Sequence, residues 1–310
     1  MNFDHERDRL SRIKPYLQLR ALVFQLTRSF FVQRGFLEID TPVRVPVVAP
    51  EEHITPFQSE GWFLSTSPEL HMKRLLASGY ERIFQITRCF RKGERGSQHN
   101  PEFTMLEWYR VGADYRRLIV DTEELVSFIA GQLVSGPAMA AERGRDIDLH
   151  LPWPRFSVRK AFLDAAGWDP IAANDPALFD TDLVTKVIPS FDPSRPVVLE
   201  GYPASMASLA RLNPKDRSAA ERAEVFIGGL ELANAYSELA DAKEQRIRFE
   251  EEAERIRAAA GHATLPERFL EAIAHMPECG GIALGMDRLA MLFCGTELIR
   301  DVMAFPDDEA

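Results

Sequence analysis

Residues 81–110 read ERIFQITRCFRKGERGSQHNPEFTMLEWYR, and this stretch decides the fold that we expect. Its β-branched and aromatic residues predict two strands, Ile83–Phe90 and Phe103–Tyr109, joined by a polar loop that contains glycine and proline. Because side chains alternate along a strand, Glu107 is expected to share a face with Tyr109, with Trp108 on the other face. A long hairpin with a solvated tip and no functional role fits the same spacing.

The residues of this hairpin resemble motif 2 of the class II aminoacyl-tRNA synthetases, in the form found in the lysyl-tRNA synthetase subgroup. The resemblance rests on Arg91 before the loop and on HNPEFTMLEWY, residues 99–109, after it. The ending LEWYR narrows it to the truncated lysyl-synthetase paralogues that ligate (R)-β-lysine onto elongation factor P. One departure is that Lys92 and Gly93 follow the arginine where family members often have Asn-Glu. The resemblance therefore assigns no role to Glu94.

Length and composition place the chain among ordinary globular proteins. It has 310 residues, 45% of them apolar, which suffices for the core of one large domain or two smaller ones, and we expect one. The formal charge of -10 argues against strong general nucleic-acid binding, although a local basic groove stays open. Cys89, Cys279 and Cys294 lack the spacing of a zinc site or a disulfide framework. No apolar run approaches the ~20 residues of a membrane span, so we expect a cytoplasmic protein.

The N-terminal part predicts a helix over residues 15–34 and a strand over Phe36–Val48, while the charged residues 2–12 are expected to be loose. Because Pro42 cannot donate a hydrogen bond to a sheet, the strand should lie at an edge or at an interface. The sequence GFLEIDTPV, residues 35–43, resembles motif 1, which implies a homodimer with Pro42 at its interface. An edge strand without a partner is the alternative.

Ser67, Pro68 and Glu69 open a helix that we expect to end near Ser78. Proline suits the first turn of a helix, and a carboxylate suits the positive end of the helix dipole. The string TSPELHMKRLL, residues 66–76, resembles the family segment that lines the amino-acid pocket. The resemblance implies that these three residues contact the substrate, whereas a purely structural role at the helix start is the alternative for Glu69.

The middle of the chain is harder to interpret. An amphipathic pattern predicts a helix over Arg116–Val134. Residues 135–222 offer only short strand candidates, Phe156–Val158 and Pro196–Leu199. Beyond them, the pair Gly228-Gly229 favours the positive φ angles of a two-residue turn and predicts a tight hairpin.

Glu231 and Glu238 are the two carboxylates of the returning strand that we expect to act together. They are seven residues apart, so a straight strand would point them to opposite faces of the sheet. A bend or bulge near Asn234 and Ala235 is therefore required if both are to line one pocket.

The C-terminal part begins with Asp241, which predicts the N-cap of a charged helix. Residues 279–293, CGGIALGMDRLAMLF, place glycines before a helix, a pattern that can bring backbone close to a phosphate. This segment resembles motif 3, and the resemblance then extends from about Leu19 to Phe305. It implies an α+β fold with an antiparallel β-sheet flanked by helices, forming a single class II catalytic domain over residues 1–310 without an anticodon-binding domain.

Adenylate formation requires a carboxylate to attack the α-phosphorus of ATP while pyrophosphate leaves, so the protein must position and neutralise charge. Arginine suits this task because its guanidinium grips phosphate oxygens bidentately. The resemblance implies that Arg91 touches the α-phosphate, that Arg288 touches the γ-phosphate and covers one face of adenine, and that Phe103 stacks on the other face. The other ATP-binding residues that it implies are Lys92, Gly93, Asn100, Glu231, Leu232 and Gly285.

Magnesium prefers hard oxygen ligands, and the resemblance makes Glu231 and Glu238 the candidate Mg2+ ligands. It also implies that Glu238, together with Tyr109, binds the ε-ammonium group of a lysine-type substrate. Glu107 and Glu69 would face the amino group near the reacting end.

Ala283 stands where lysyl-tRNA synthetases usually have glycine. One methyl group discriminates between substrates by only about 1–3 kcal/mol. Resemblance to the paralogues implies that the alanine adapts the pocket to (R)-β-lysine, whose amino group is displaced by one carbon. A more rigid backbone without any effect on specificity is the alternative.

The leading hypothesis is an ATP-dependent ligase that activates (R)-β-lysine, or lysine, as an adenylate and transfers it to a lysine side chain of elongation factor P. The acceptor is implied by the resemblance alone. Two alternatives stay open, a stand-alone enzyme similar to lysyl-tRNA synthetase that charges a tRNA, and a catalytically inactive paralogue with a regulatory role.

Overall fold

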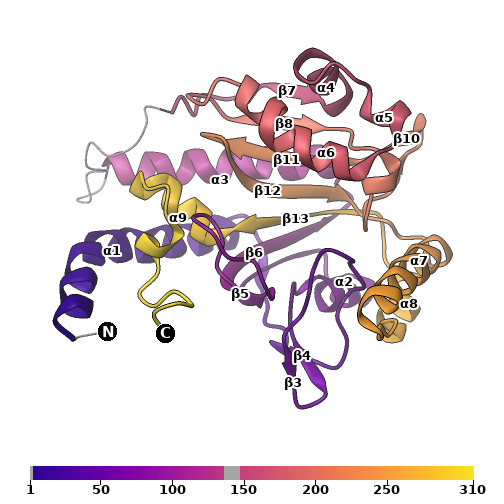
Figure 1. Cartoon of the computed structure of the whole chain (residues 1–310), viewed down its shortest axis with the longest axis horizontal. Helices are drawn as coiled ribbons and strands as arrows, with labels where there is room; N and C mark the ends of the chain where they lie inside the picture. Colours follow the sequence, from indigo (N-terminus) through magenta and orange to yellow (C-terminus); the bar gives the residue numbers. More distant parts are fainter. Residues whose placement is uncertain (1–2, 136–146) are drawn as a thin grey trace.

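The computed structural model describes residues 3–135 and 147–310, and an eight-stranded sheet runs through their centre (Figure 1). The strand order is β1-β5-β6-β13-β12-β11-β8-β7. All neighbours are antiparallel except the outer pairs β1–β5 and β7–β8. In that order the strands are Leu37–Glu38, Arg82–Phe90, Glu102–Val111, Cys279–Gly285, Leu230–Ser237, Arg222–Ile227, Val197–Glu200 and Arg155–Ser157. This confirms the predicted fold class.

The two predicted hairpins are both present in the sheet. β5 and β6 pair in unbroken register from Arg82 opposite Arg110 to Phe90 opposite Glu102. β11 and β12 are joined by Gly228-Gly229, whose φ angles are +63° and +80°. Two consecutive positive φ angles match the right-handed twist of the strands, and glycine adopts them without steric cost.

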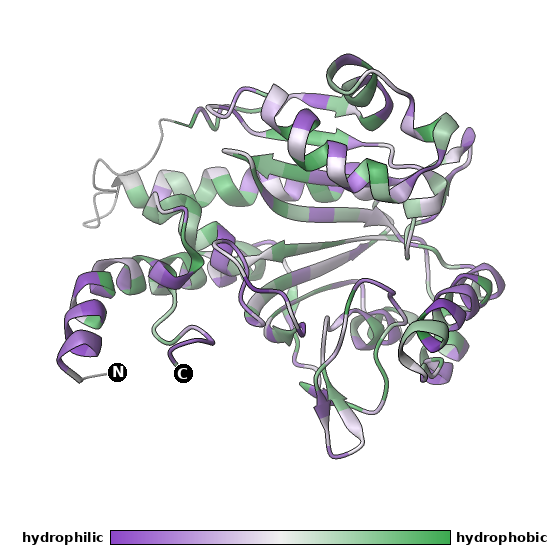
Figure 2. Ribbon diagram, viewed as in Figure 1, coloured by the Kyte–Doolittle hydropathy of each residue, from purple (hydrophilic) through white to green (hydrophobic). Residues whose placement is uncertain are grey.

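Helices flank the sheet. The longer ones are α1 (Phe3–Gln33), α2 (Glu69–Ala77), α3 (Tyr115–Ser135), α7 (Ala242–Ala260) and α9 (Met286–Cys294), and the shorter ones are α4 (Val158–Ala165), α5 (Pro170–Ala173), α6 (Pro176–Asp182) and α8 (Glu267–Ile273). Asp241 caps α7 by accepting hydrogen bonds from the Lys243 and Glu244 amides, as predicted. Figure 2 shows α7 as mostly hydrophilic, in keeping with a solvated helix. Within the described ranges, no helix combines the length and apolarity that a membrane crossing needs.

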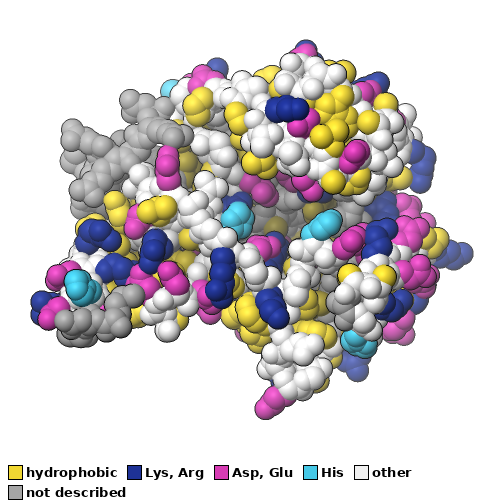
Figure 3. All heavy atoms as spheres, in the orientation of Figure 1, with side chains coloured by type: hydrophobic (Ala, Val, Ile, Leu, Met, Phe, Trp, Pro, Cys, Tyr) yellow, Lys and Arg dark blue, Asp and Glu magenta, His cyan; other side chains and the backbone are white. Residues whose placement is uncertain are grey.

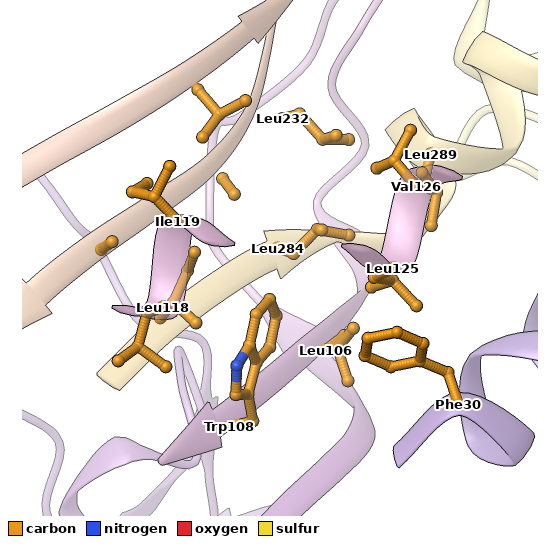
Figure 4. Close-up of a cluster of buried hydrophobic side chains, with 14 of the residues drawn as sticks. Phe30, Leu106, Trp108, Leu118, Ile119, Leu125, Val126, Leu232, Leu284 and Leu289 are labelled. Atoms are coloured by element: carbon orange, nitrogen blue, oxygen red, sulfur yellow. The ribbon is translucent and has the colours of Figure 1, made fainter. Parts of the chain in front are cut away.

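The main hydrophobic core lies where α1, α3 and α9 pack on one face of the sheet. Figure 4 shows side chains from these helices gathered around Leu106 and Trp108 of β6. Both are fully buried, which confirms the predicted alternation along this strand. Since Leu106 and Trp108 enter the core, Glu107 and Tyr109 project from the opposite face.

The N-terminal segment was expected to be loose, and this prediction is wrong for residues 3–12, which form the first turns of α1. Figure 1 shows a bend in this helix, and Pro15, which lies inside it and lacks an N–H group, gives the physical reason. Arg9 donates a hydrogen bond to the Ala304 carbonyl at 2.5 Å and pairs with the Glu309 carboxylate. The C-terminal segment therefore holds these turns in place.

The predicted strand over residues 36–48 is present only as two pairs of residues, β1 and β2 (Arg44–Val45). Exposed Pro42 stands between them, and a proline breaks the ladder because it lacks a donor. β1 is the edge strand of the large sheet, as predicted. β2 instead joins a small three-stranded sheet with β4 (Trp62–Leu64) and β3 (Gln58–Ser59).

Residues 155–222 contain more structure than the sequence suggested. The two predicted short strands are confirmed as β7, which lies one residue earlier than predicted, and β8, which lies one residue later. Three helices that the sequence analysis did not anticipate, α4, α5 and α6, begin at Ser157, Asp169 and Asp175, whose side chains cap the first turns. A separate hairpin of β9 (Leu212–Asn213) and β10 (Asp216–Ala220) follows.

Candidate active site

A cavity of about 350 Å³ opens on the face of the sheet that carries Glu107 and Tyr109. Its walls come from β6, β12 and β13, from the first residues of α2 and α9, and from the loop between β5 and β6. It is lined by the predicted site residues Ser67, Glu69, Arg91, Asn100, Phe103, Glu107, Tyr109, Glu231, Leu232, Glu238, Ala283, Gly285 and Arg288. Two arginines and two glutamates that the hypothesis required to converge thus share one cavity.

One end of the cavity is built around a buried lysine. The Lys73 ammonium lies 2.6 Å from the Glu238 carboxylate and 2.5 Å from that of Glu69, one helical turn before it. The side chains of Lys73 and Glu238 are each 1% exposed. Burial alone would lower the pKa of Lys73, but the two carboxylates outweigh it and raise the pKa, so the lysine is charged.

Glu107 completes this acidic end from β6. Its carboxylate accepts hydrogen bonds from the Tyr109 hydroxyl and, at 3.0 Å, from the Ser67 hydroxyl. Burial, with the negative charge of Glu69 next, raises the pKa of Glu107 to about 8. Burial also raises the pKa of Glu238. When ionised, these three glutamates exceed Lys73 by two charges, so this end favours a ligand with two cationic groups.

A β-bulge brings Glu231 and Glu238 to the same cavity. In the pairing of β11 with β12, Val225 faces Ala233 but the next residue, Phe226, faces Glu231, so Leu232 is an extra residue. A bulge of this kind reverses the alternation of side chains beyond it. The predicted bulge is therefore present, but it lies two to three residues before the expected position at Asn234 and Ala235.

Arg91 lies where β5 passes into the loop. Its guanidinium carbon is 5.2 Å from the centre of the Phe103 ring. Nε donates to the Thr66 carbonyl at 3.3 Å, and one terminal nitrogen lies 3.6 Å from the Glu94 carboxylate. A guanidinium beside an aromatic face is a suitable surface for a phosphate joined to a planar base.

Arg288 lies opposite, in the first turn of α9. It donates to the Glu231 carbonyl at 2.8 Å and lies 2.8 Å from Nε2 of His99. Burial first, and then the charge of Arg288, lower the pKa of His99. A neutral imidazole can accept a hydrogen bond from the arginine, so the β5–β6 loop and α9 are joined across the cavity.

Asp287, the residue before Arg288, fixes the start of α9. Asp287 is buried, and it accepts a hydrogen bond from Arg20 of α1 at 2.7 Å and another from the Thr104 amide of β6 at 2.6 Å. Charge-assisted hydrogen bonds of this kind are shorter and stronger than neutral ones. Arg288 is consequently anchored to two other elements through its neighbour.

Three predicted contact residues do not line the cavity. Lys92 is exposed, and its amide donates to the Thr55 carbonyl at 2.8 Å. Gly93 has a φ of +88° and forms the turn that returns the loop. Pro68 occupies the N-cap of α2, one residue before Glu69. These residues shape the backbone around the site, and the structure gives them no side-chain role in it.

The predicted pairing of Glu231 and Glu238 as magnesium ligands is not supported. Glu238 already faces the Lys73 cation, and in residues 3–135 and 147–310 no group of three acidic, histidine or cysteine side chains could hold a metal. Glu231, whose side chain is 44% exposed, makes only a long contact with Arg288, at 3.5 Å, and can still meet an ion that comes with phosphates. Magnesium commonly binds through one or two carboxylates and the substrate phosphates, so Glu231 fits and Glu238 does not.

Sequence reasoning missed three polar residues of the site. Lys73 could have been found from its spacing, since it follows Glu69 at the i,i+4 distance of a helical ion pair. Asn234 lines the cavity, donates to Glu224 at 3.2 Å, and keeps a buried Oδ1 without a partner among the described residues. Glu51 also lines it, from a loop whose path no local pattern predicted.

The surface around the site mixes charges of both signs. Figure 3 shows Lys and Arg side chains interspersed with Asp and Glu over this face, with no single basic field. The formal charge of -10 agrees with this distribution. Clustered cations supply most of the affinity for nucleic acids, and this view of the described residues shows no such cluster.

Comparison with known proteins gives a consistent result. The family model of class II tRNA synthetases (D, K and N) matches residues 5–309. The chain belongs to this family. It is 42% identical over 305 residues to the elongation factor P--(R)-beta-lysine ligase of Proteus mirabilis, with 93% of each chain covered. Its identity to the proteins of the same name from Klebsiella pneumoniae and Salmonella arizonae is 40% and 39%, with 96% of each chain covered.

Membership of the class II tRNA synthetase family confirms the resemblance drawn from the three motifs. The hairpin β5–β6 carries the residues that resemble motif 2, and β13 with α9 carries those that resemble motif 3. In this class II domain, the two segments are adjacent, because β6 pairs with β13 from Met105 opposite Gly285 to Val111 opposite Cys279. The chain is thus an enzyme of the ligase type that its relatives represent.

Proposed function

We propose that this chain is an ATP-dependent ligase that activates (R)-β-lysine, or lysine, as an adenylate and transfers it to a lysine side chain of elongation factor P. The observation that carries the proposal is the acidic end of the cavity. There, Glu69 and Glu238 pair with the single ammonium of Lys73, and Glu107 adds a third carboxyl group nearby. A substrate with two ammonium groups restores the charge balance.

This acidic end selects one substrate class among those of the family. Aspartate would bring a second carboxylate next to three others, and asparagine would bring only one ammonium group. A lysine-type diamine supplies two cations, and the unpaired Oδ1 of Asn234 offers a further acceptor for an N–H group. Ala283 lines the same cavity and is the residue that we propose adapts it to a β-amino acid.

The opposite end of the cavity provides for the nucleotide. We propose that Arg91 neutralises charge at the α-phosphate, where the substrate carboxylate attacks, and that Arg288 binds the γ-phosphate. The ring of Phe103 would stack on adenine. Glu231 would hold Mg2+ together with the phosphates, and the ion would supply electrostatic stabilisation of the leaving pyrophosphate. The attacking carboxylate is already an anion, so this first step requires no general base.

Three wider features belong to the same proposal. A homodimer is supported by apolar side chains left exposed around motif 1, namely Val32, Leu37 and Val43 at 59%, 51% and 37%. A single catalytic domain over residues 1–310 is supported by the family match, which spans residues 5–309. A cytoplasmic location follows from an acceptor that acts in translation.

Pyrophosphate exchange tests the first half-reaction. The purified chain is incubated with ATP, Mg2+ and labelled pyrophosphate in the presence of (R)-β-lysine, lysine, aspartate or asparagine. We expect exchange with the two diamines and none with the other two amino acids. Exchange with aspartate, or with none of the four, would contradict the assignment of the acidic end.

Mass spectrometry tests the second half-reaction. Elongation factor P and a lysine tRNA are offered together to the enzyme, ATP and (R)-β-lysine, and the acceptor that gains the mass of one β-lysyl group is identified. We expect elongation factor P to be modified. Modification of the tRNA alone would favour the synthetase alternative. Pyrophosphate exchange without modification of either elongation factor P or the tRNA would show that the proposed acceptor is wrong.

A further inference from the structure

Glu51 borders the cavity at a place that adenylate formation does not use. It lies on the loop between β2 and β3, and it lines both the main cavity and a second, much narrower one walled by Val45, Val47, Val48 and Ala49. The loop is fixed by a hydrogen bond from the Glu52 amide to Glu252 at 3.1 Å and by an ion pair of Glu52 with Arg255 at 3.2 Å. The Glu51 side chain is partly exposed, so it is accessible from solvent.

The Glu51 carboxylate is uncommitted. Across residues 3–135 and 147–310, no group donates a hydrogen bond to it or forms an ion pair with it. The charged groups that face it are Glu69 of α2, Arg91 after β5, Glu252 of α7 and Arg222 of β11, with Tyr236 of β12 and His71 of α2 also near. Burial, and after it the negative charge of Glu69, raise the pKa of Glu51 to about 7, while the positive charge of Arg91 acts in the opposite direction.

Two of these neighbours suggest the chemical position of Glu51. In the proposed function, Glu69 faces the amino end of the amino acid and Arg91 faces the α-phosphate. Glu51 lines the same cavity as both and interacts electrostatically with each, which places it beside the acyl phosphate bond of the adenylate. The other acids are engaged, since Glu69 and Glu238 face Lys73, and Glu107 accepts hydrogen bonds from two hydroxyl groups. Glu94 and Glu231 pair with Arg91 and Arg288, so among the described acids of the cavity Glu51 is a partly exposed one without a partner.

The transfer step needs such a group. A lysine side chain of a protein reaches the enzyme as an ammonium ion, which cannot attack a carbonyl until it loses a proton. We propose that Glu51 is a catalytic residue of the transfer step, which binds the ammonium group of the acceptor lysine at the mouth of the cavity and removes one of its protons. This inference rests on the proposed function, because it requires an amine as the acceptor.

The step balances in atoms and charge. One N–H proton passes from the ammonium to the Glu51 carboxylate and then to water. The neutral amine attacks the acyl carbon, a C–N bond forms, and the C–O bond to the phosphate of AMP breaks with its electron pair on the leaving oxygen. The second proton, made acidic when nitrogen becomes positively charged, leaves with AMP.

The experiment compares Glu51→Gln with Glu60→Gln, which loses the same charge at a side chain that is 90% exposed in the turn between β3 and β4. For each variant, pyrophosphate exchange is measured first. The adenylate is then formed, and its transfer is followed in single turnover to elongation factor P and to hydroxylamine, which is an uncharged amine at neutral pH. We expect Glu51→Gln to keep its exchange rate within a few fold and to lose roughly 100-fold in transfer to the protein, the usual contribution of a general base. Transfer to hydroxylamine should be unchanged.

A pH series adds a second readout. In the unmodified enzyme, the transfer rate should level off above the pKa of Glu51, whereas in Glu51→Gln it should keep rising with pH as free amine accumulates. Equal losses with both acceptors, no loss with either, or an equal loss in Glu60→Gln would overturn this role. Absence of exchange in the unmodified enzyme would overturn the proposed function, and the role of Glu51 with it.

Discussion

The ammonium group of Lys73 lies 2.6 Å from the carboxylate of Glu238, and each side chain is only 1% exposed. Two charges that deep in a protein are stable only when each compensates the other, because removing either leaves a buried charge without a partner. Lys73 thus keeps an acidic pocket compatible with folding before any substrate arrives.

Replacement of Lys73 by methionine should destabilise the protein by about 3–5 kcal/mol, the usual cost of breaking a buried ion pair. The free energy of unfolding, measured by urea titration, provides the test. Lys160→Met is the matched control, because Lys160 also forms an i,i+4 ion pair, with Asp164, but both partners are largely exposed. Its loss should cost no more than about 0.5 kcal/mol. Equal effects of the two substitutions would contradict the role of burial.

Gly281→Ala should weaken the binding of lysine-type substrates. A methyl group at this position of β13 would lie 2.1 Å from a carboxylate oxygen of Glu238 and 2.4 Å from the ring of Tyr109, closer than atoms can approach. Both side chains must therefore move. The Michaelis constant for (R)-β-lysine in pyrophosphate exchange is expected to rise by roughly 10-fold or more, from a shift worth 1–3 kcal/mol.

Gly131→Ala is the control for this substitution. Gly131 lies in α3, where a methyl group would meet nothing within 4 Å. Alanine is a better helix former than glycine, so this variant should gain up to about 1 kcal/mol in stability and keep the same Michaelis constant. A Gly281→Ala enzyme that binds the substrate normally would show that Glu238 and Tyr109 do not form the substrate site.

The stability of the unliganded protein should fall as the pH rises from about 4.5 to about 8. The pKa of Glu107 is raised to about 8 in the folded protein, above the ordinary value of 4.5, so the folded state binds more protons than the unfolded state within that window. Stability is then lost as the pH rises through the folded-state pKa. The melting temperature measured against pH tests this, and Glu107→Gln should flatten the slope. A slope that is unchanged in this variant would exclude Glu107 as its source.

Arg91→Ala should slow pyrophosphate exchange by roughly 100-fold or more, since one preorganised charge at a reacting phosphate contributes that much to a rate. Arg88→Ala is the control from the same strand, because Arg88 is half exposed and pairs with Glu102, which is also half exposed. This control should keep the rate of the unmodified enzyme. Similar rates in the two variants would remove Arg91 from the phosphate site.

Much of the fold was predictable because it is encoded locally. The alternation in β6 placed Trp108 in the core and Glu107 in the cavity, and the pair Gly228-Gly229 specified its turn. Such patterns act through neighbouring residues, so a single sequence displays them. The bulge at Leu232 was required by geometry but displaced from the expected position, because any residue of a strand can be the extra one.

The unpredicted parts depend on contacts between distant segments. Lys73 can be charged in the interior because Glu238, which follows β12, lies beside it. No pattern within α2 predicts that partner. Residues 3–12 looked unsupported because their partners Ala304 and Glu309 come from the other end of the chain. Glu51 reaches the cavity on a loop that is held by α7.

The C-terminal residues work as a strap across the nucleotide end of the molecule. The Ile299 amide donates to the Ser97 carbonyl at 2.8 Å, the Asp307 amide donates to the Asn100 side chain at 3.0 Å, and Glu309 holds Arg9. The β5–β6 loop, which we propose to face ATP, and the first turns of α1 are therefore held by the same segment. A protease cut, a fused tag or a binding partner that lifts this strap would loosen both at once, and the affinity for ATP would report on an event far from the phosphates.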